Sequence, residues 1–102
     1  MWIEAASVTE IPVGSSKIVS HKRMELALFH TEEGYFCIEN FCPHAGGPLG
    51  EGCLQGYMVT CPWHSWDFDV RSGRLCHNTE VAVPTYACRV TEEAVGKKLL
   101  KA

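Results

Sequence analysis

The chain has 102 residues, 46% of them hydrophobic and 21% charged, which suits one ordinary globular domain over residues 1–102 and leaves no room for a second large catalytic one. Its formal charge is −3, and no cluster of lysine and arginine offers a phosphate-binding stripe, which argues against a nucleic-acid partner. No stretch approaches the length of a membrane span, and the amino terminus lacks a basic start and an apolar signal core. We therefore expect a cytoplasmic protein that has no membrane partner.

Taken in chain order, the sequence predicts short strands separated by turns and almost no helix. Strand candidates occur at residues 17–20, 24–28, 35–38, 57–60, 66–70 and 81–83, and a turn at residues 32–34 would join the second and third of them as a hairpin. In the second of these, Met24, Leu26 and Leu28 alternate with Glu25 and Ala27, which is the two-residue period of a half-buried strand. The pattern as a whole predicts an all-β fold.

Two parts of the chain depart from this pattern. Helix-forming residues at 92–101 are interrupted by Gly96, and we predict a last hairpin that turns near this glycine. Residues 41–65 are richer in glycine, proline, cysteine and histidine than their flanks. Such a composition is typical of a loop-built site inserted into a β scaffold.

The loop-rich region contains two Cys/His pairs that predict a metal site. Cys42 and His44 are separated by one residue, Cys61 and His64 by two, and sixteen residues lie between the pairs. Two short loops that each present a thiolate and an imidazole would together make a four-ligand site. A secreted disulfide scaffold is disfavoured because there is no export signal, and cysteines of the cytosol usually stay reduced or bind metal. A Cys₂His₂ zinc site remains open, since the same four ligand types suit tetrahedral Zn²⁺.

The residues around these pairs closely resemble the two cluster-binding boxes of Rieske ferredoxins. The boxes are residues 42–52, with the sequence CPHAGGPLGEG, and residues 61–69, with the sequence CPWHSWDFD. Similar proteins include the ferredoxin components of bacterial ring-hydroxylating dioxygenases and the small subunits of some nitrite reductases. The strong resemblance covers about residues 40–73. It implies a Rieske-type antiparallel β-sandwich or barrel, with these residues as an inserted cluster-binding subdomain at one tip.

The resemblance also implies a role for each ligand. It places one [2Fe–2S] cluster on each chain, with Cys42 and Cys61 binding one iron while His44 and His64 bind the other. Neutral imidazoles in place of two thiolates remove negative charge, so such centres have potentials of about −150 to +300 mV, against about −400 mV for plant-type clusters. We expect the electron to reside on the histidine-bound iron.

Departures from the resemblance predict the subtype. High-potential Rieske proteins of respiratory complexes carry an extra cysteine in each box, joined as a disulfide, and Gly47 and Trp63 stand at those positions here. Those proteins also place a serine and a tyrosine where this chain has Trp66 and Phe68. Fewer hydroxyl donors leave the reduced state less stabilised, so we predict a potential near the low end of the range. Ser65 replaces the glycine that is common after the second histidine.

The function that these features favour is electron transfer rather than catalysis. The chain would take one electron from a flavoprotein or ferredoxin reductase and pass it to a terminal oxygenase or reductase. Two alternatives remain: a tightly bound small subunit of a nitrite-reductase-like enzyme, and a zinc-stabilised interaction module. The cysteines outside the boxes are expected to be buried and inert; they are Cys37, Cys53, Cys76 and Cys88. Asp67 and Asp69 are expected to make turn and loop hydrogen bonds rather than to act in acid–base catalysis.

Overall fold

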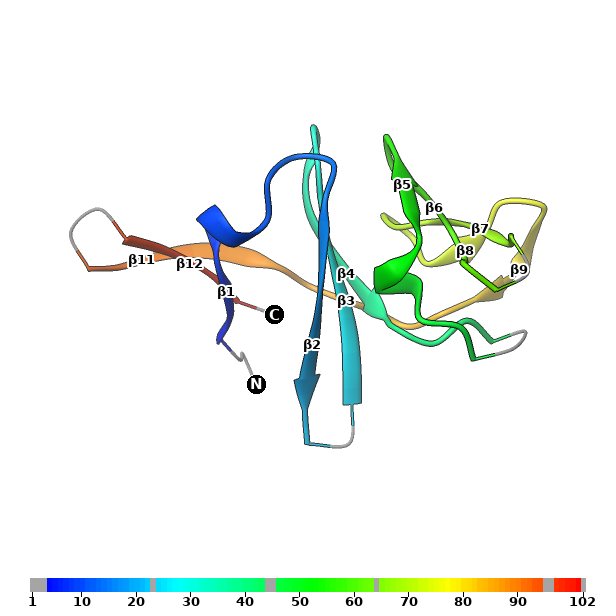
Figure 1. Cartoon of the computed structure of the whole chain (residues 1–102), viewed down its shortest axis with the longest axis horizontal. Coiled ribbons are helices and arrows are strands. Elements are labelled where there is room, and N and C mark those ends of the chain that lie inside the picture. The colour runs from blue at the N-terminus through cyan, green and yellow to red at the C-terminus, as the bar shows by residue number, and fades with distance from the viewer. Residues whose placement is uncertain (1–3, 23, 44–45, 64, 95–96, 102) are drawn as a thin grey trace.

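A computed structural model describes residues 4–22, 24–43, 46–63, 65–94 and 97–101. It contains three β-sheets, which lie in succession along the longest axis of the molecule (Figure 1). Every pair of neighbouring strands is antiparallel, and the helical elements of the described residues are two single 3-10 turns. The all-β prediction is therefore confirmed.

The central sheet has four strands in the order β10-β4-β3-β2. Its strands are β2 (Ser16–His21), β3 (Met24–Thr31), β4 (Gly34–Glu39) and β10 (Thr85–Tyr86). The predicted hairpin is the β3–β4 pair, whose register aligns Thr31 with Gly34 at the turn. This sheet forms the middle of the molecule and contacts both of the others.

The burial of β3 differs from the sequence prediction. Leu26, Ala27, Leu28 and Phe29 are all buried, so both faces of the strand are covered, whereas Met24 is 42% exposed. The prediction of a strand is confirmed, but the prediction of a half-buried one is wrong. The physical reason is that another sheet packs against each face of the central sheet, which an alternation of apolar residues along one strand does not reveal.

One neighbouring sheet contains the first strand and the last two strands of the chain. It has the order β1-β12-β11, with β1 (Glu4–Ser7), β11 (Arg89–Ala94) and β12 (Lys97–Lys101), and the 3-10 turn η1 (Val8–Glu10) follows β1. The predicted carboxyl-terminal hairpin is confirmed by the pairing of β11 with β12, although Gly96 itself lies outside the described residues. A buried apolar cluster lies between this sheet and the central one; it contains Ala5, Ala6, Ile11, Leu26, Leu28 and Cys37.

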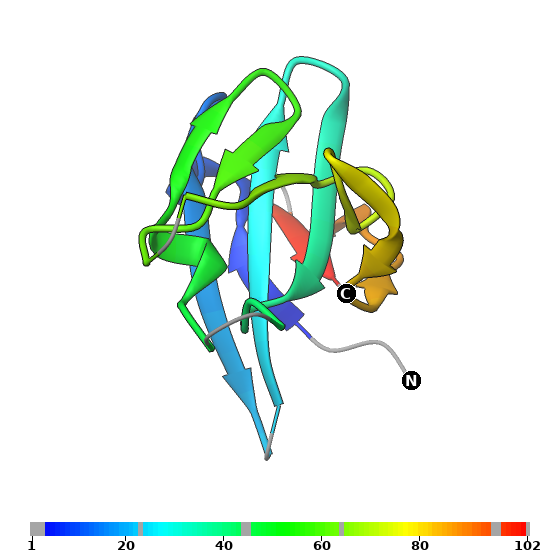
Figure 2. The same cartoon turned by 90° about the vertical axis from the view of Figure 1, so that its right-hand side faces the viewer.

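The third sheet covers the opposite face of the central sheet, in front of it in Figure 2. Its order is β5-β6-β7-β8-β9, and its strands are β5 (Cys53–Gln55), β6 (Met58–Thr60), β7 (Asp67–Asp69), β8 (Arg74–Leu75) and β9 (Asn78–Ala82). A second apolar cluster joins the two sheets; among its buried members are Ala27, Phe29, Ile38, Leu49, Val59 and Phe68. Cys42 and Cys61 belong to this cluster.

A surface arginine links the third sheet to the β3–β4 turn. The Arg71 guanidinium lies 3.7 Å from the centre of the Tyr57 ring, and it pairs with Asp69 at 3.0 Å and with Glu33 at 3.5 Å. Exposed ion pairs contribute little individually, but the stacked and paired guanidinium holds three segments in one arrangement. The contact adds a surface link between the two sheets that the apolar cluster joins.

Candidate metal centre

The first box begins with a closed loop, which lies between β4 and the 3-10 turn η2 (Leu49–Glu51). The Cys42 N–H donates to the Gly47 carbonyl at 2.9 Å, and the Gly46 N–H donates to the Cys42 carbonyl at 2.7 Å. Gly46 has a φ of +75°, a left-handed conformation that glycine adopts without steric cost. The main chain thus returns to Cys42 after five residues.

The second box, between β6 and β7, has the same hydrogen-bond pattern. The Cys61 N–H donates to the Trp66 carbonyl at 2.8 Å, and the Ser65 N–H donates to the Cys61 carbonyl at 3.1 Å. Ser65 also has a positive φ, +57°, at the position equivalent to Gly46. In each box the cysteine is followed by a proline, whose fixed φ stiffens the loop. Two matching loops therefore present one cysteine each.

The two loops bring their cysteines together in the core. Cys42 is 2% exposed and Cys61 is 1% exposed, and both belong to the same buried cluster. Burial raises the pKa of Cys61, the Trp63 backbone N–H acts in the opposite direction, and Cys42 raises the pKa further. Two adjacent thiolates in apolar surroundings repel one another, so a cation between them would relieve both repulsion and desolvation.

The other two predicted ligands, His44 and His64, lie outside the described residues. In the sequence each falls between its cysteine and the residue that closes the loop, at the second position after Cys42 and the third after Cys61. Within the described part of the chain, no group of three or more His, Cys, Asp or Glu side chains is placed to hold a metal ion. The structure thus brings together the cysteine half of the predicted ligand set.

Gly47 lets the two loops approach each other. A Cβ atom at this position would lie 2.8 Å from the Cys61 sulfur and 3.2 Å from the Trp63 Cβ. The positions that resemble the disulfide of high-potential proteins are therefore neighbours in space, and neither holds a cysteine. Because glycine has no side chain, Gly47 leaves space beside the Cys61 sulfur for a group that is bound to that sulfur.

Asn40 anchors the first loop, a role that the sequence analysis did not identify. Its buried side-chain oxygen accepts from the Gly50 N–H at 2.7 Å, and its backbone oxygen accepts from the Leu49 N–H at 2.6 Å. Its side-chain amide donates to the Glu25 carboxylate of β3 at 3.2 Å. The sequence signal was a polar residue two positions before Cys42, which is too common to assign a role.

Asp67 stabilises the two strands that flank the second loop. Its carboxylate accepts from the Thr60 hydroxyl at 2.6 Å and lies 3.6 Å from the His77 ring nitrogen. Asp69 accepts from the backbone N–H of Arg71 at 2.9 Å, as a turn residue does. The prediction that these two aspartates make structural hydrogen bonds is confirmed.

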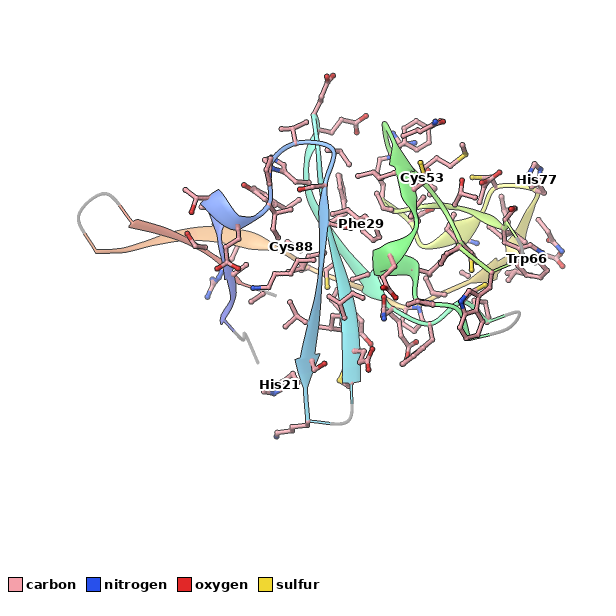
Figure 3. All side chains as sticks on the ribbon, viewed as in Figure 1. His21, Phe29, Cys53, Trp66, His77 and Cys88 are labelled. Carbon is pink, nitrogen blue, oxygen red and sulfur yellow. The ribbon has the colours of Figure 1, made fainter. Side chains whose placement is uncertain are left out.

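The surface beside the boxes is apolar. Trp63 is 53% exposed and Phe41 is 44% exposed, whereas Trp66 is half-buried and packs against the core (Figure 3). Large exposed aromatic side chains on a small protein are typical of a surface that contacts another protein.

Of the cysteines outside the boxes, Cys37 is buried and Cys88 is half-buried, but Cys53 and Cys76 are exposed. The expectation of burial is therefore wrong for the last two. Cys53 begins the edge strand β5, and Cys76 lies in the turn between β8 and β9, where the central sheet does not cover either residue. Their thiols are accessible to reagents.

Known proteins match this chain along most of its length. The model of the Rieske [2Fe–2S] domain matches residues 1–87. The ferredoxin component of a naphthalene 1,2-dioxygenase system from Pseudomonas aeruginosa is 34% identical over 92% of this chain and 91% of its own length. The ferredoxin subunit of a biphenyl dioxygenase from a Pseudomonas strain is 36% identical over 72% of this chain and 69% of its own.

Solved structures show the same fold. The ferredoxin of carbazole 1,9a-dioxygenase from Nocardioides aromaticivorans has a TM-score of 0.85 at 23% identity, covering 100% of this chain and 97% of that one. A nitrite reductase small subunit from Mycobacterium tuberculosis has a TM-score of 0.84 at 24% identity, covering 100% and 95%. Among the described residues, no helix has the length and apolar character needed to cross a membrane.

Proposed function

Since this chain belongs to the Rieske [2Fe–2S] domain family, we propose that Cys42, His44, Cys61 and His64 hold its cluster, one on each chain. The observation that carries the proposal is the pair of matching loops, each of which buries a cysteine sulfur beside the other. Each loop contains one histidine in its sequence, so two imidazoles complete the two-sulfur, two-nitrogen set of a Rieske centre. The family match supports iron–sulfur over the zinc alternative.

The cluster supplies one-electron redox chemistry when it is bound. Among the described residues, Cys61 lies in an apolar cluster, and the Trp63 backbone N–H acts to lower the pKa of its thiol. Phe68, fully buried in the same core cluster, brings no hydroxyl group. Since hydrogen bonds to the sulfurs stabilise the more negative reduced state, we place the potential near the low end of the range of about −150 to +300 mV.

The chain is a ferredoxin-type electron carrier, the electron-transfer component of an oxygenase system rather than its catalytic subunit. We propose that it takes one electron from a flavoprotein or ferredoxin reductase and passes it to a terminal oxygenase. The relatives' names, as ferredoxin components of dioxygenase systems, support transfer to an oxygenase. A solved complex of oxygenase and ferredoxin in carbazole 1,9a-dioxygenase also supports it, and this chain has a similar fold with a TM-score of 0.79. Exposed Trp63 and Phe41 provide apolar contact area beside the boxes.

We place this carrier in the cytoplasm. Cysteines of this compartment usually stay reduced or bind metal, as the proposed ligands Cys42 and Cys61 would. A fixed place in a nitrite-reductase-like enzyme is the second candidate, supported by the small-subunit structure of the same fold. Co-purification with a large catalytic chain would favour that candidate over a diffusing carrier.

The ligand assignment is tested by metal analysis and pulsed electron paramagnetic resonance. We expect about two irons, about two sulfides and no zinc per chain, with nitrogen couplings from coordinated imidazole in the reduced protein. His44→Cys and His64→Cys should each remove part of the nitrogen coupling and lower the potential, because a thiolate adds negative charge. His21→Gln, outside both boxes, is the control. Unchanged couplings and potential in His44→Cys would contradict its assignment as a ligand.

The transfer function is tested by mixing the protein with a flavoprotein ferredoxin reductase and NADH. The visible spectrum should bleach as the cluster is reduced, and the colour should return on addition of an oxidised Rieske oxygenase. Phe68→Tyr should raise the potential, by about 40 mV for each 1 kcal/mol by which a new hydrogen bond favours the reduced state. A wild-type potential near the top of the Rieske range would contradict the subtype.

A further inference from the structure

Cys37 and Cys88 meet on the face of the central sheet that lies away from the boxes. Cys37 on β4 lies opposite Tyr86 on β10, and Cys88 follows Tyr86 by two residues. Both belong to the apolar cluster between the central sheet and the β1-β12-β11 sheet. Cys88 packs against the buried cluster that contains Cys37, and each of the two thiols shifts the pKa of the other.

We propose that Cys37 and Cys88 form a redox-active thiol pair, which closes to a reversible intramolecular disulfide when a small disulfide such as glutathione disulfide is the oxidant. This modification site is separate from the electron-transfer function and does not depend on the cluster assignment. Closure joins the sulfurs of these two neighbouring residues at a bond length of about 2.0 Å.

The environment of the pair gives each thiol a different role. The Cys37 thiol lowers the pKa of Cys88, against the effect of burial, while Cys88 and burial raise the pKa of Cys37. Cys88 is also the more exposed of the two. Since the thiolate is the nucleophile in disulfide exchange, Cys88 is the thiol that attacks an external disulfide and Cys37 is the thiol that resolves the adduct.

The exchange balances without any further reactant. The Cys88 thiolate attacks one sulfur of glutathione disulfide, which forms a mixed disulfide and releases one glutathione thiolate. Cys37 then loses its proton to that base and attacks the Cys88 sulfur, which releases the second glutathione. Two protein thiols are oxidised, and one glutathione disulfide is reduced to two glutathione thiols.

The position of Cys88 gives the bond a structural consequence. The chain passes from β10 of the central sheet to β11 of the neighbouring sheet through residues 87–88. Figure 3 shows Cys88 on the side of the central sheet that faces β1, with Trp66 on the other side. A bond to Cys37 would clamp this passage to β4 and close a loop with 50 residues between the two cysteines. Closing so long a loop restricts the unfolded chain strongly.

The test uses the cluster-loaded protein, equilibrated without oxygen in glutathione buffers of increasing disulfide content. Free thiols are alkylated, and the chain is cut with a glutamate-specific protease. This protease releases Cys37 on residues 34–39 and Cys88 on residues 81–92, each without any other cysteine. We expect these two peptides to become linked as the disulfide fraction rises, and to separate on reduction. The melting temperature should rise by roughly 10 °C on linkage, with an unchanged visible spectrum of the cluster.

The matched controls are Cys88→Ser and Cys53→Ser. Cys88→Ser should lose the linked peptide and the shift in melting temperature, whereas Cys53→Ser should keep both. If Cys88→Ser fails to fold, Cys37→Ala provides the same comparison. The proposal is overturned if Cys37 and Cys88 both stay free, and are therefore alkylated, at high glutathione disulfide. It is also overturned if Cys88 stops at the mixed disulfide with glutathione, or if only Cys53 and Cys76 react.

Discussion

The contact between Gly47 and the Cys61 sulfur makes Gly47→Ala a sharp test of the site. An added Cβ would lie 2.8 Å from the sulfur and 3.1 Å from the nearest Trp63 atom, whereas ordinary contacts between such atoms are about 3.5–4.0 Å. One neighbour must therefore move by roughly 0.7–1 Å. Cys61 is held by hydrogen bonds at its N–H and its carbonyl, so the strain falls on the Cys61 sulfur and on the half-exposed indole of Trp63.

Overpacking of this kind costs about 1–3 kcal/mol, which corresponds to a fall in melting temperature of roughly 5–20 °C for a domain of this size. Because the displaced atom is a proposed ligand, we also expect reduced iron content or a shifted potential and visible spectrum. Differential scanning calorimetry, iron analysis and potentiometric titration of the same preparation measure these three effects.

Gly46→Ala provides the matched control. Gly46 has a positive φ of +75°, and no atom of the described residues lies within 4 Å of an added Cβ, so alanine there costs backbone strain of about 1–2 kcal/mol without pressing on a cysteine sulfur. Both variants should melt earlier, but only Gly47→Ala should alter the spectrum or potential. Normal iron content, spectrum and potential in Gly47→Ala would show that Cys61 is not held as the structure describes.

Three further outcomes are expected. In the double variant Gly47→Cys/Trp63→Cys, the two Cβ positions are 3.2 Å apart, close to the distance of about 3.5–4.5 Å in disulfides. A disulfide that stabilises the fold by up to about 3 kcal/mol should therefore form. A mass spectrum that shows both thiols still protonated would contradict this. Ser65→Gly should raise stability by up to about 1 kcal/mol, because it removes a serine from a left-handed conformation; a lower melting temperature would show that the serine hydroxyl contributes more than the strain costs. Burial opposes ionisation of Asp69, but hydrogen bonds from Arg71 outweigh it and lower the pKa of Asp69. Its stabilisation is therefore present above an unfolded pKa of about 3.9 and lost as the pH falls through the lower folded value, so Asp69→Asn should flatten acid unfolding below about pH 4. An unchanged acid-unfolding profile would exclude that contribution.

Local patterns were sufficient to predict most of the strands. The β3–β4 hairpin, β6, β7 and the carboxyl-terminal hairpin all lie where alternation and turn residues placed them, because these signals act between residues close in the chain. The positive φ of Ser65 could also have been predicted, by aligning the second box on the first and noting that Ser65 takes the place of Gly46.

Residues whose roles depend on distant partners were missed. Asn40 anchors the first loop through Gly50 and Glu25, which lie on either side of it in the sequence at separations of ten and fifteen residues. A buried amide is recognisable only when the groups that satisfy it are known, since an exposed asparagine has the same sequence appearance. The exposure of Cys53 and Cys76 was missed for the same reason, because it depends on which sheet covers which strand.

The sequence by itself determined the proposed ligand set, because two cysteines and two histidines at short spacings offer these donors whatever surrounds them. The tertiary structure alone decided which residues pack around these ligands and which lie on the other side of the central sheet. Two sheets cover opposite faces of the central one, which buries both faces of β3 and separates the cysteines of the boxes from Cys37 and Cys88. Burial and cross-sheet contact are properties of packed surfaces, and no run of residues along one strand encodes which surface will cover it.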